Sequence, residues 1–117
     1  MDLAAKLQIK PGTTVAIIAA PADGPDLSGV GPAAAPAEAG AVIAFARHKD
    51  ELAGIAADAI EAARQDRLAW VAYPKGGQLG TDLSRDSLAA ALSGHGITPV
   101  RQVALDDVWS ALRFRPA

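Results

Sequence analysis

The stretch that decides the fold runs from residue 41 to residue 73: Ala41-Val42-Ile43-Ala44-Phe45-Ala46, then an amphipathic segment over residues 49–65, then Leu68-Ala69-Trp70-Val71-Ala72-Tyr73. Neither apolar run alternates with polar residues, which is typical of strands covered on both faces. The segment between them repeats its apolar residues at helical spacing: Leu52, Ile55, Ala56, Ala59, Ile60 and Ala63. This order of strand, helix and strand predicts a parallel pair joined by a right-handed crossover.

Upstream of this unit the sequence predicts one more strand and an irregular connection. The segment 10–12, Lys-Pro-Gly, is typical of a turn, and residues 14–20 form an apolar run that we expect to be a strand buried on both faces. Residues 21–40 contain four prolines and four glycines among small residues. Because proline and glycine both disfavour a helix interior, we expect this Pro-, Gly- and Ala-rich segment to be irregular.

Downstream the sequence predicts a short helix followed by a hairpin. Ser84 is a suitable N-cap for a helix over residues 85–93, which ends at a following glycine. Residues 99–105 and 108–115 alternate apolar and polar positions, with two aspartates at 106–107 between them. This pattern predicts an antiparallel hairpin with its turn at the aspartates.

The chain of 117 residues fits a single domain, because a second core would have too little chain. We expect an α/β fold, with a small three-layer, Rossmann-like sheet that is mostly parallel and closes with a C-terminal antiparallel hairpin. This order of elements resembles the C-terminal half of methyltransferase-type Rossmann-like sheets. The resemblance implies a spatial order in which only the strand at 108–115 is antiparallel to the rest: 14–20, 41–46, 68–73, 108–115, 99–105.

Four stretches of the chain, taken together, resemble an uncharacterised bacterial family known as domain of unknown function 3052. These stretches are Lys6-Leu7-Gln8-Ile9-Lys10-Pro11-Gly12, Trp70-Val71-Ala72-Tyr73-Pro74-Lys75-Gly76, Asp82-Leu83-Ser84-Arg85-Asp86-Ser87-Leu88 and Val108-Trp109-Ser110-Ala111-Leu112-Arg113-Phe114-Arg115. The resemblance covers nearly the whole chain apart from residues 21–40. It implies no particular activity, substrate or catalytic residue.

Amino-acid composition limits the kinds of partner and the cellular compartment that we expect for this chain. A formal net charge of −2 gives no general attraction to nucleic acid or to an anionic membrane surface. The chain has no cysteine, which excludes disulfides, thiol nucleophiles and metal sites held by thiolates. The first residues lack the pattern of a signal peptide, and no window approaches the length of a membrane span. We therefore expect a soluble, cytoplasmic bacterial protein that binds neither membrane nor nucleic acid.

The familiar cofactor and metal motifs do not occur. The turn over residues 19–24, Ala-Ala-Pro-Ala-Asp-Gly, lacks the acidic-Gly-x-Gly pattern of a working methyltransferase, and the chain has no nicotinamide or Walker-type phosphate fingerprint. His48 and His95 are the only histidines, and neither has the spaced partners of a metal site. We expect no cofactor, no metal site and no catalytic residue.

The loop over residues 74–86 concentrates the polar chemistry of the chain. It leaves a buried strand and enters a helix, which is where α/β proteins usually bind ligands. Six of its residues are candidates for binding a phosphate or carboxylate: Lys75, Gly76, Gly77, Thr81, Ser84 and Arg85. The alternative interpretation is structural, with Pro74 ending the strand, the glycines forming turns, and Asp82 or Ser84 capping the helix.

The last predicted strand offers a second candidate surface. Trp109, Arg113 and Arg115 fall on one of its faces. If the other face meets the core, these three residues form an exposed surface that suits a partner chain, a nucleotide or a single strand of nucleic acid. The alternative is a solvated strand whose Trp109 is covered by a neighbouring helix.

These observations favour a non-catalytic binding or protein-interaction module that uses the edge of the sheet near residues 75–85. The alternative is a degenerate transferase-like enzyme or sensor that binds a nucleotide-like or anionic small molecule at the 74–86 loop. A homodimer formed by pairing of sheet edges is compatible with either function.

Overall fold

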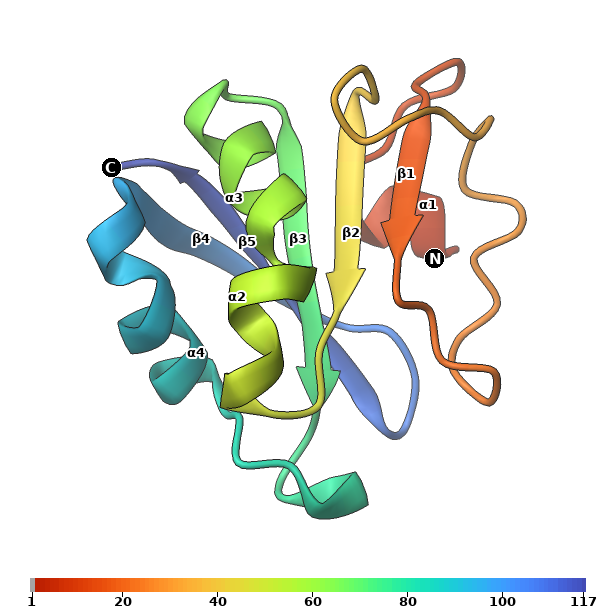
Figure 1. Cartoon of the computed structure of the whole chain (residues 1–117). Helices are drawn as coiled ribbons and strands as arrows, with labels where there is room; N and C mark the ends of the chain where they lie inside the picture. The colour runs from red at the N-terminus through yellow and green to blue at the C-terminus, as the bar shows by residue number, and fades with distance from the viewer. Residues whose placement is uncertain (1) are drawn as a thin grey trace.

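The strands β2 (Ala41–Phe45) and β3 (Leu68–Pro74) pair in parallel within a five-stranded sheet in the computed structural model, which describes residues 2–117 (Figure 1). β1 (Val15–Ile18) lies beside β2, β5 (Trp109–Pro116) lies beside β3, and β4 (Ile97–Ala104) forms the far edge. The predicted strand order is therefore confirmed. β1, β2 and β3 are parallel, and β5 is antiparallel to both β3 and β4, as expected.

The crossover between β2 and β3 is helical, but it is not one continuous helix. It consists of η1 (Lys49–Glu51), α2 (Leu52–Ile55) and α3 (Ala57–Arg64), with a break at Ala56. In Figure 1 the chain runs down β2, back up through these helices in front of the sheet, and down β3 to the left of β2, which is a right-handed crossover. All five residues of β2 are buried, as its uninterrupted apolar sequence predicts.

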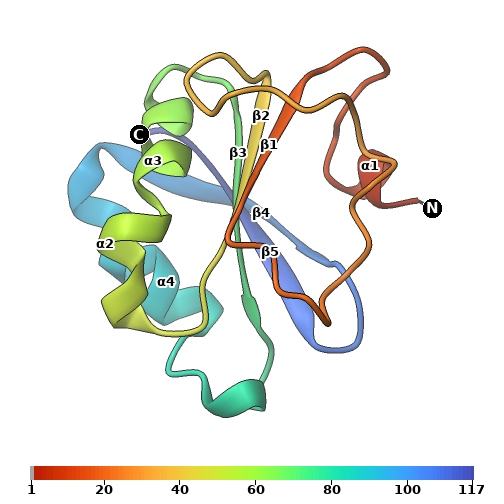
Figure 2. The ribbon, with the colours of Figure 1, turned by 45° about the vertical axis from the view of Figure 1, so that its right-hand side comes forward.

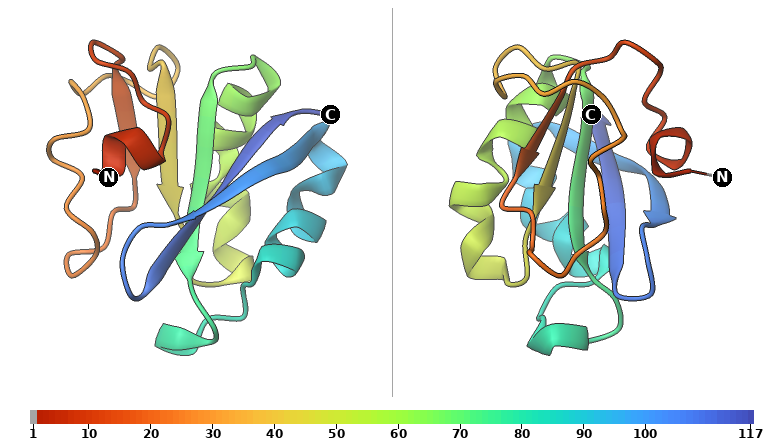
Figure 3. Two further views of the ribbon diagram at one scale, coloured as in Figure 1. Left: turned by 180° about the vertical axis from the view of Figure 1, so that it is seen from behind. Right: turned by 90° about the vertical axis from the view of Figure 1, so that its right-hand side faces the viewer.

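The two faces of the sheet are covered by different kinds of structure. α2, α3 and α4 (Arg85–Leu92) cover one face, and α1 (Leu3–Lys6) lies on the opposite side (Figures 2 and 3). The core on the helical side includes Val42, Val71 and Leu88. The core on the other side includes Trp70 and Trp109 together with residues of the N-terminal segment and of the connection after β1. The third layer is therefore one helical turn plus irregular chain.

The first strand corrects one expectation. β1 was expected to be buried on both faces, yet Ile17 is 39% exposed and Ile18 is only partly buried. The reason is that β1 is an edge strand whose only outer neighbour is the irregular connection. That connection forms no helix or named strand, as predicted, but it touches β1 at one point, where the Val15 amide donates to the Pro32 carbonyl (2.8 Å) and the Ala34 amide donates to the Val15 carbonyl (3.0 Å).

The hairpin and the α4 cap form as the sequence predicts. β4 and β5 pair in antiparallel fashion, and the Asp106 carboxylate accepts from the Val108 amide (2.8 Å) and the Trp109 amide (2.7 Å) to fix the turn. Ser84 caps α4, because its hydroxyl accepts from the Ser87 amide at 3.1 Å. No helix in the described part of the chain is long and apolar enough to cross a membrane.

Candidate functional site

The loop after β3 holds its lysine in an internal hydrogen bond. Lys75 is partly buried, and its ammonium Nζ donates to the Asp106 carbonyl at 2.5 Å, across to the turn of the hairpin. The Lys75 amide donates to the Val108 carbonyl of the same turn at 2.7 Å. Lys75 was a candidate anion ligand, but its side chain and amide connect two loops at the carboxyl end of the sheet.

Two hydroxyls of this loop are also bonded within the protein. Thr81 Oγ1 donates to the Arg47 carbonyl and accepts from the Leu83 amide at 3.0 Å, so it links the loop to the end of β2. Ser84 serves as the α4 N-cap. Of the six candidate residues for an anion, three therefore use their side chains in structural hydrogen bonds, as the structural interpretation of the loop requires.

The remaining three candidates lie at the surface of the loop. Gly76 and Gly77 adopt positive φ values of 54° and 79°, where glycine is favoured, so they form the turns that the structural interpretation assigned to them. Arg85 is exposed at the first position of α4. Anion binding by this loop stays a prediction, and among the candidate side chains it depends most on Arg85.

The predicted Trp109 surface is wrong. Trp109 is only 2% exposed and packs edge-on against Phe45, with ring centroids 5.3 Å apart and an interplanar angle of 75°. Arg113 is partly buried and donates from Nη1 to Gln8 Oε1 at 2.6 Å. Arg115 is exposed, and its Nε lies 3.3 Å from Asp66 Oδ1. The surface fails because the N-terminal segment covers this face of the sheet, so both faces of β5 meet apolar cores.

The two sheet edges, which a homodimer by strand pairing would join, are both obstructed. The bridge to Ala33 occupies the outer side of β1 at Val15. β4 contains Pro99, which lacks an amide donor, and the register of its pairing shifts between Pro99 and Arg101. Homodimer formation stays a prediction, and these features disfavour edge pairing as its mechanism.

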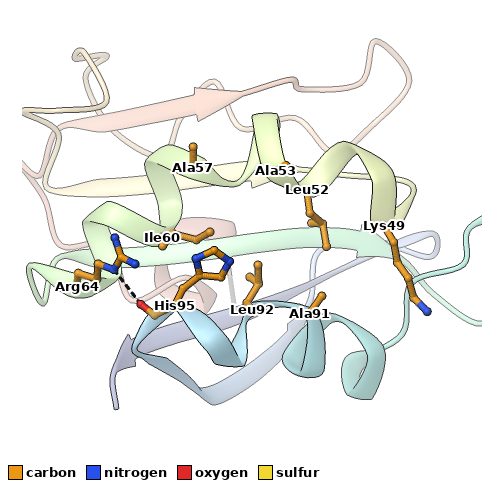
Figure 4. A pocket seen from close by; sticks show the side chains of 9 residues that line it. All are labelled: Lys49, Leu52, Ala53, Ala57, Ile60, Arg64, Ala91, Leu92 and His95. Atoms are coloured by element: carbon orange, nitrogen blue, oxygen red, sulfur yellow. Dashed lines mark hydrogen bonds between the residues drawn. The ribbon is translucent and has the colours of Figure 1, made fainter.

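A largely apolar concave surface lies on the helical face, away from the two candidate surfaces predicted from the sequence. A groove of about 420 Å³ runs between the α2–α3 segment and α4 (Figure 4). Six of its nine lining residues are alanine, leucine or isoleucine: Leu52, Ala53, Ala57, Ile60, Ala91 and Leu92. We call this feature the helix groove. Its volume lies within the range of about 300–1,000 Å³ that is typical of ligand pockets.

The ends of the helix groove carry cationic side chains. Lys49 lies at one end, and Arg64 and His95 lie together at the other (Figure 4). The Arg64 guanidinium is held in place because its Nε donates to the His95 carbonyl at 2.8 Å. Its Nη1 lies 3.6 Å from Glu61 Oε2, an exposed ion pair that leaves the cation accessible.

The sequence did contain a pattern that points to the helix groove. Lys49, Ala53, Ala57, Ile60 and Arg64 follow one another at helical spacing, so they form a stripe beside the core-facing residues of the same helices. Read as a surface, this stripe is apolar in the middle and cationic at both ends. Only the position of α4 turns it into a groove.

The carboxyl end of β2 is organised by a glutamate. Glu51 Oε1 accepts from the Arg47 amide at 2.7 Å and from the His48 amide at 2.9 Å, which secures the start of η1. His48 Nδ1 lies 3.8 Å from Asp82 Oδ1, and His95 is exposed. Within residues 2–117 no three side chains of the types His, Cys, Asp and Glu lie close enough together to hold a metal ion.

Comparisons with models of known protein families, with curated proteins and with solved structures find no match to this chain.

Proposed function

We propose that this chain is a non-catalytic binding module that docks an acidic, amphipathic helix of a partner protein in the helix groove. The observation that carries the proposal is the groove itself, an apolar channel between two helical segments with cationic side chains at both ends. The proposal moves the binding surface from the 74–86 loop, whose lysine and hydroxyls are hydrogen-bonded internally.

The alanines of the groove favour a helix as the occupant. Ala53, Ala57 and Ala91 are exposed, and they line the groove with side chains that stop at Cβ. Short side chains let the backbone of a third helix approach closely, and two adjacent helices offer the ridges and grooves into which such a helix packs. Leu52, Ile60 and Leu92 form the apolar floor beneath them.

The charges favour an acidic partner. Lys49 and Arg64 are 15 residues apart in the sequence, a separation of about 22 Å in a continuous α-helix, although the crossover here breaks at Ala56. A partner helix with carboxylates about 15 positions apart would place one at each end of the groove. Such exposed ion pairs add little affinity, but they fix the orientation and register of the docked helix.

Several expectations from the sequence are carried forward as parts of this proposal. The strand order supports a Rossmann-like sheet that resembles the C-terminal half of a methyltransferase fold, and the resemblance to family 3052 supports a bacterial, cytoplasmic protein. The alternative function remains an enzyme or sensor that binds an anionic small molecule at the 74–86 loop through Arg85 and the glycine amides.

A peptide titration tests the docking proposal. The probe is an amphipathic helical peptide of about 18 residues, with leucine and alanine on one face and two glutamates about 15 positions apart. A second peptide carries lysines in place of the glutamates. Binding is followed by amide chemical shifts of the isotope-labelled protein, and we expect shifts in α2, α3 and α4 with the acidic peptide only.

A matched pair of variants locates the binding surface. Ala57→Arg fills the groove with a long side chain, whereas Ala90→Arg places the same side chain on the exposed part of α4 outside the lining. We expect Ala57→Arg to weaken binding by at least about tenfold, which is the loss of roughly 1.4 kcal/mol. Equal affinity of both variants, or shifts confined to residues 74–86, would reject the groove and favour the alternative function.

A further inference from the structure

A second concave surface lies at the amino end of the parallel strands, opposite the 74–86 loop. It has a volume of about 550 Å³ and is bordered by Gly40, which precedes β2, and by Leu68, which begins β3. Its polar lining comes from three parts of the chain: Gln8, Lys10, Thr13, Asp66, Arg67 and Arg113. We call it the amino-end concavity. Three of these side chains are cationic and one is anionic.

Arg67 is a rigid cation in this concavity. Its Nη1 donates to the Pro36 carbonyl at 2.9 Å and to the Ala39 carbonyl at 2.6 Å, and its Nε donates to Gln65 Oε1 at 2.9 Å. These bonds fix the plane of the guanidinium and leave Nη2 outside them. A guanidinium fixed in this way loses little conformational freedom when it binds an oxyanion.

Arg113 has a donor that finds no acceptor in the protein. Its Nη1 donates to Gln8 Oε1 at 2.6 Å, but its Nε is buried and has no hydrogen-bond partner within residues 2–117. Buried donors are rarely left without an acceptor, because the lost solvation of the N–H is not compensated. Because Nε is enclosed and Nη1 is bonded to Gln8, an anion in the concavity would contact Arg113 through Nη2, which forms no hydrogen bond within residues 2–117.

The lining of the concavity carries a net positive charge, with three cations and one carboxylate. The carboxylate of Asp66 is already paired, since its Oδ1 lies 3.3 Å from Arg115 Nε. Arg101 stands directly opposite Arg113 in the β4–β5 ladder. The pKa of Arg113 is lowered, first by burial and then by the cation of Arg115, with a smaller contribution from Arg101 and an opposing one from Asp66. The charged form of Arg113 is therefore destabilised, and a bound anion would relieve this.

Lys10 supplies a third cation that is free to move. It is exposed and forms no hydrogen bond or ion pair with its side chain in the described part of the chain. The Thr13 hydroxyl lies in the same lining and is partly buried. The concavity thus combines two planar guanidinium groups, one flexible ammonium and one hydroxyl.

We infer that the amino-end concavity binds the phosphate group of a small phosphorylated molecule, with Arg67 and Arg113 as fixed donors and Lys10 as a mobile counter-charge. Guanidinium groups match the oxygens of a phosphate in pairs, which is the geometry that two fixed arginines favour. The cations gather in one concavity and do not form a stripe, so a small molecule fits better than a nucleic acid backbone. This inference does not depend on the helix groove.

Calorimetric titration with inorganic pyrophosphate and with ADP, at constant ionic strength and with chloride as the reference anion, tests the inference. Lys10→Gln removes an exposed cation of the lining, and Arg113→Gln removes the buried one. Lys49→Gln is the matched control, because it removes an exposed cation beyond the other end of β2, outside this lining. Circular dichroism of each variant verifies its fold, and Lys10→Gln keeps the test valid if Arg113→Gln does not fold.

We expect pyrophosphate to bind the unmodified chain, and Lys10→Gln and Arg113→Gln each to weaken that binding by about tenfold, whereas Lys49→Gln changes it by less than about twofold. Similar affinities for pyrophosphate and ADP would support recognition of the phosphate alone, and tighter ADP binding would support a nucleotide as its source. No binding at millimolar pyrophosphate and ADP would overturn the inference. So would an equal loss in Lys49→Gln and Lys10→Gln, or displacement of pyrophosphate by a short oligonucleotide at far lower concentration.

Discussion

The two ends of the parallel strands use their charged and polar side chains in opposite ways. At the carboxyl end, Lys75, Thr81 and Ser84 are hydrogen-bonded to the hairpin turn, to the end of β2 and to the start of α4. At the amino end, Arg67 is also bonded within the protein, but Arg113 Nε has no acceptor within residues 2–117 and Lys10 is exposed. The residue types at the two ends are similar, but their hydrogen-bond partners are not.

This difference teaches how a binding site is recognised in a small α/β domain. Ligands of such folds usually lie at the carboxyl ends of the strands, which is why the 74–86 loop attracts attention in the sequence. A lysine, a threonine and a glycine turn are also what a loop needs in order to hold itself together. The two uses differ in whether the donors already have acceptors within the protein. This criterion favours the amino end as the binding site.

The largest effect is expected from Trp109, which fills the core at the carboxyl end. Trp109→Ala should lower the free energy of unfolding by about 3–5 kcal/mol, because a large buried ring is replaced by a cavity. Urea denaturation measures this loss. Val100→Ala, at a position that is 48% exposed, is the control and should change stability by less than about 0.5 kcal/mol. A loss below about 1 kcal/mol for Trp109→Ala would contradict its burial and restore the predicted exposed surface.

A smaller difference in the free energy of unfolding is expected between variants of Lys75 and Lys10. Lys75→Met should lower the free energy of unfolding by about 1–2 kcal/mol, because the ammonium that bridges to the Asp106 carbonyl is lost. Lys10→Met should stay within about 0.5 kcal/mol of the unmodified chain, since Lys10 has no partner in the described residues. Thermal or urea denaturation of both variants gives the comparison. Equal stabilities would mean that the Lys75 ammonium makes no stabilising contact. Lys75 would then again be a candidate anion ligand of the carboxyl-end loop.

The smallest effect concerns the pH dependence of stability. Tyr73 is the only tyrosine, and the pKa of its phenol is raised above 10.0, mainly by burial. Above pH 10 the unfolded chain therefore loses this proton before the folded chain does. The stability contributed by the protonated phenol is fully present below pH 10 and is lost as the pH rises through the folded pKa.

Absorbance at alkaline pH follows this titration, and Tyr73→Phe is its control. The difference in unfolding free energy between the unmodified chain and Tyr73→Phe should be constant below pH 10 and should fall above it. A constant difference at all pH values would show that Tyr73 ionises equally in both states. In that case the hydrogen bond that Gln102 donates to the phenol oxygen, at 2.7 Å, would not shield the Tyr73 phenol from water.

The strands were predictable because their sequences are unambiguous. The runs at 41–46 and 68–73 contain no polar residue that alternation would require on a solvent face. The place of the hairpin at the far side of the sheet followed from the resemblance to methyltransferase-type sheets. The exposure of Ile17 was not predictable from the same kind of run. An apolar strand has the same sequence pattern whether its outer neighbour is a layer of helices or an irregular connection.

Local sequence patterns account for the helices, strands and turns of this protein. Periodicity, caps and turns each act over a few residues. Local structure is therefore specified by the apolar runs, by Ser84 and by the aspartates at 106–107. Only the tertiary structure decided which polar groups are free. Lys75 and Asp106 are 31 residues apart, and Arg113 and Gln8 are 105 apart, so their contacts arise from packing between distant segments. The helix groove and the amino-end concavity exist for the same reason, because each is formed by surfaces that become neighbours only when the sheet assembles.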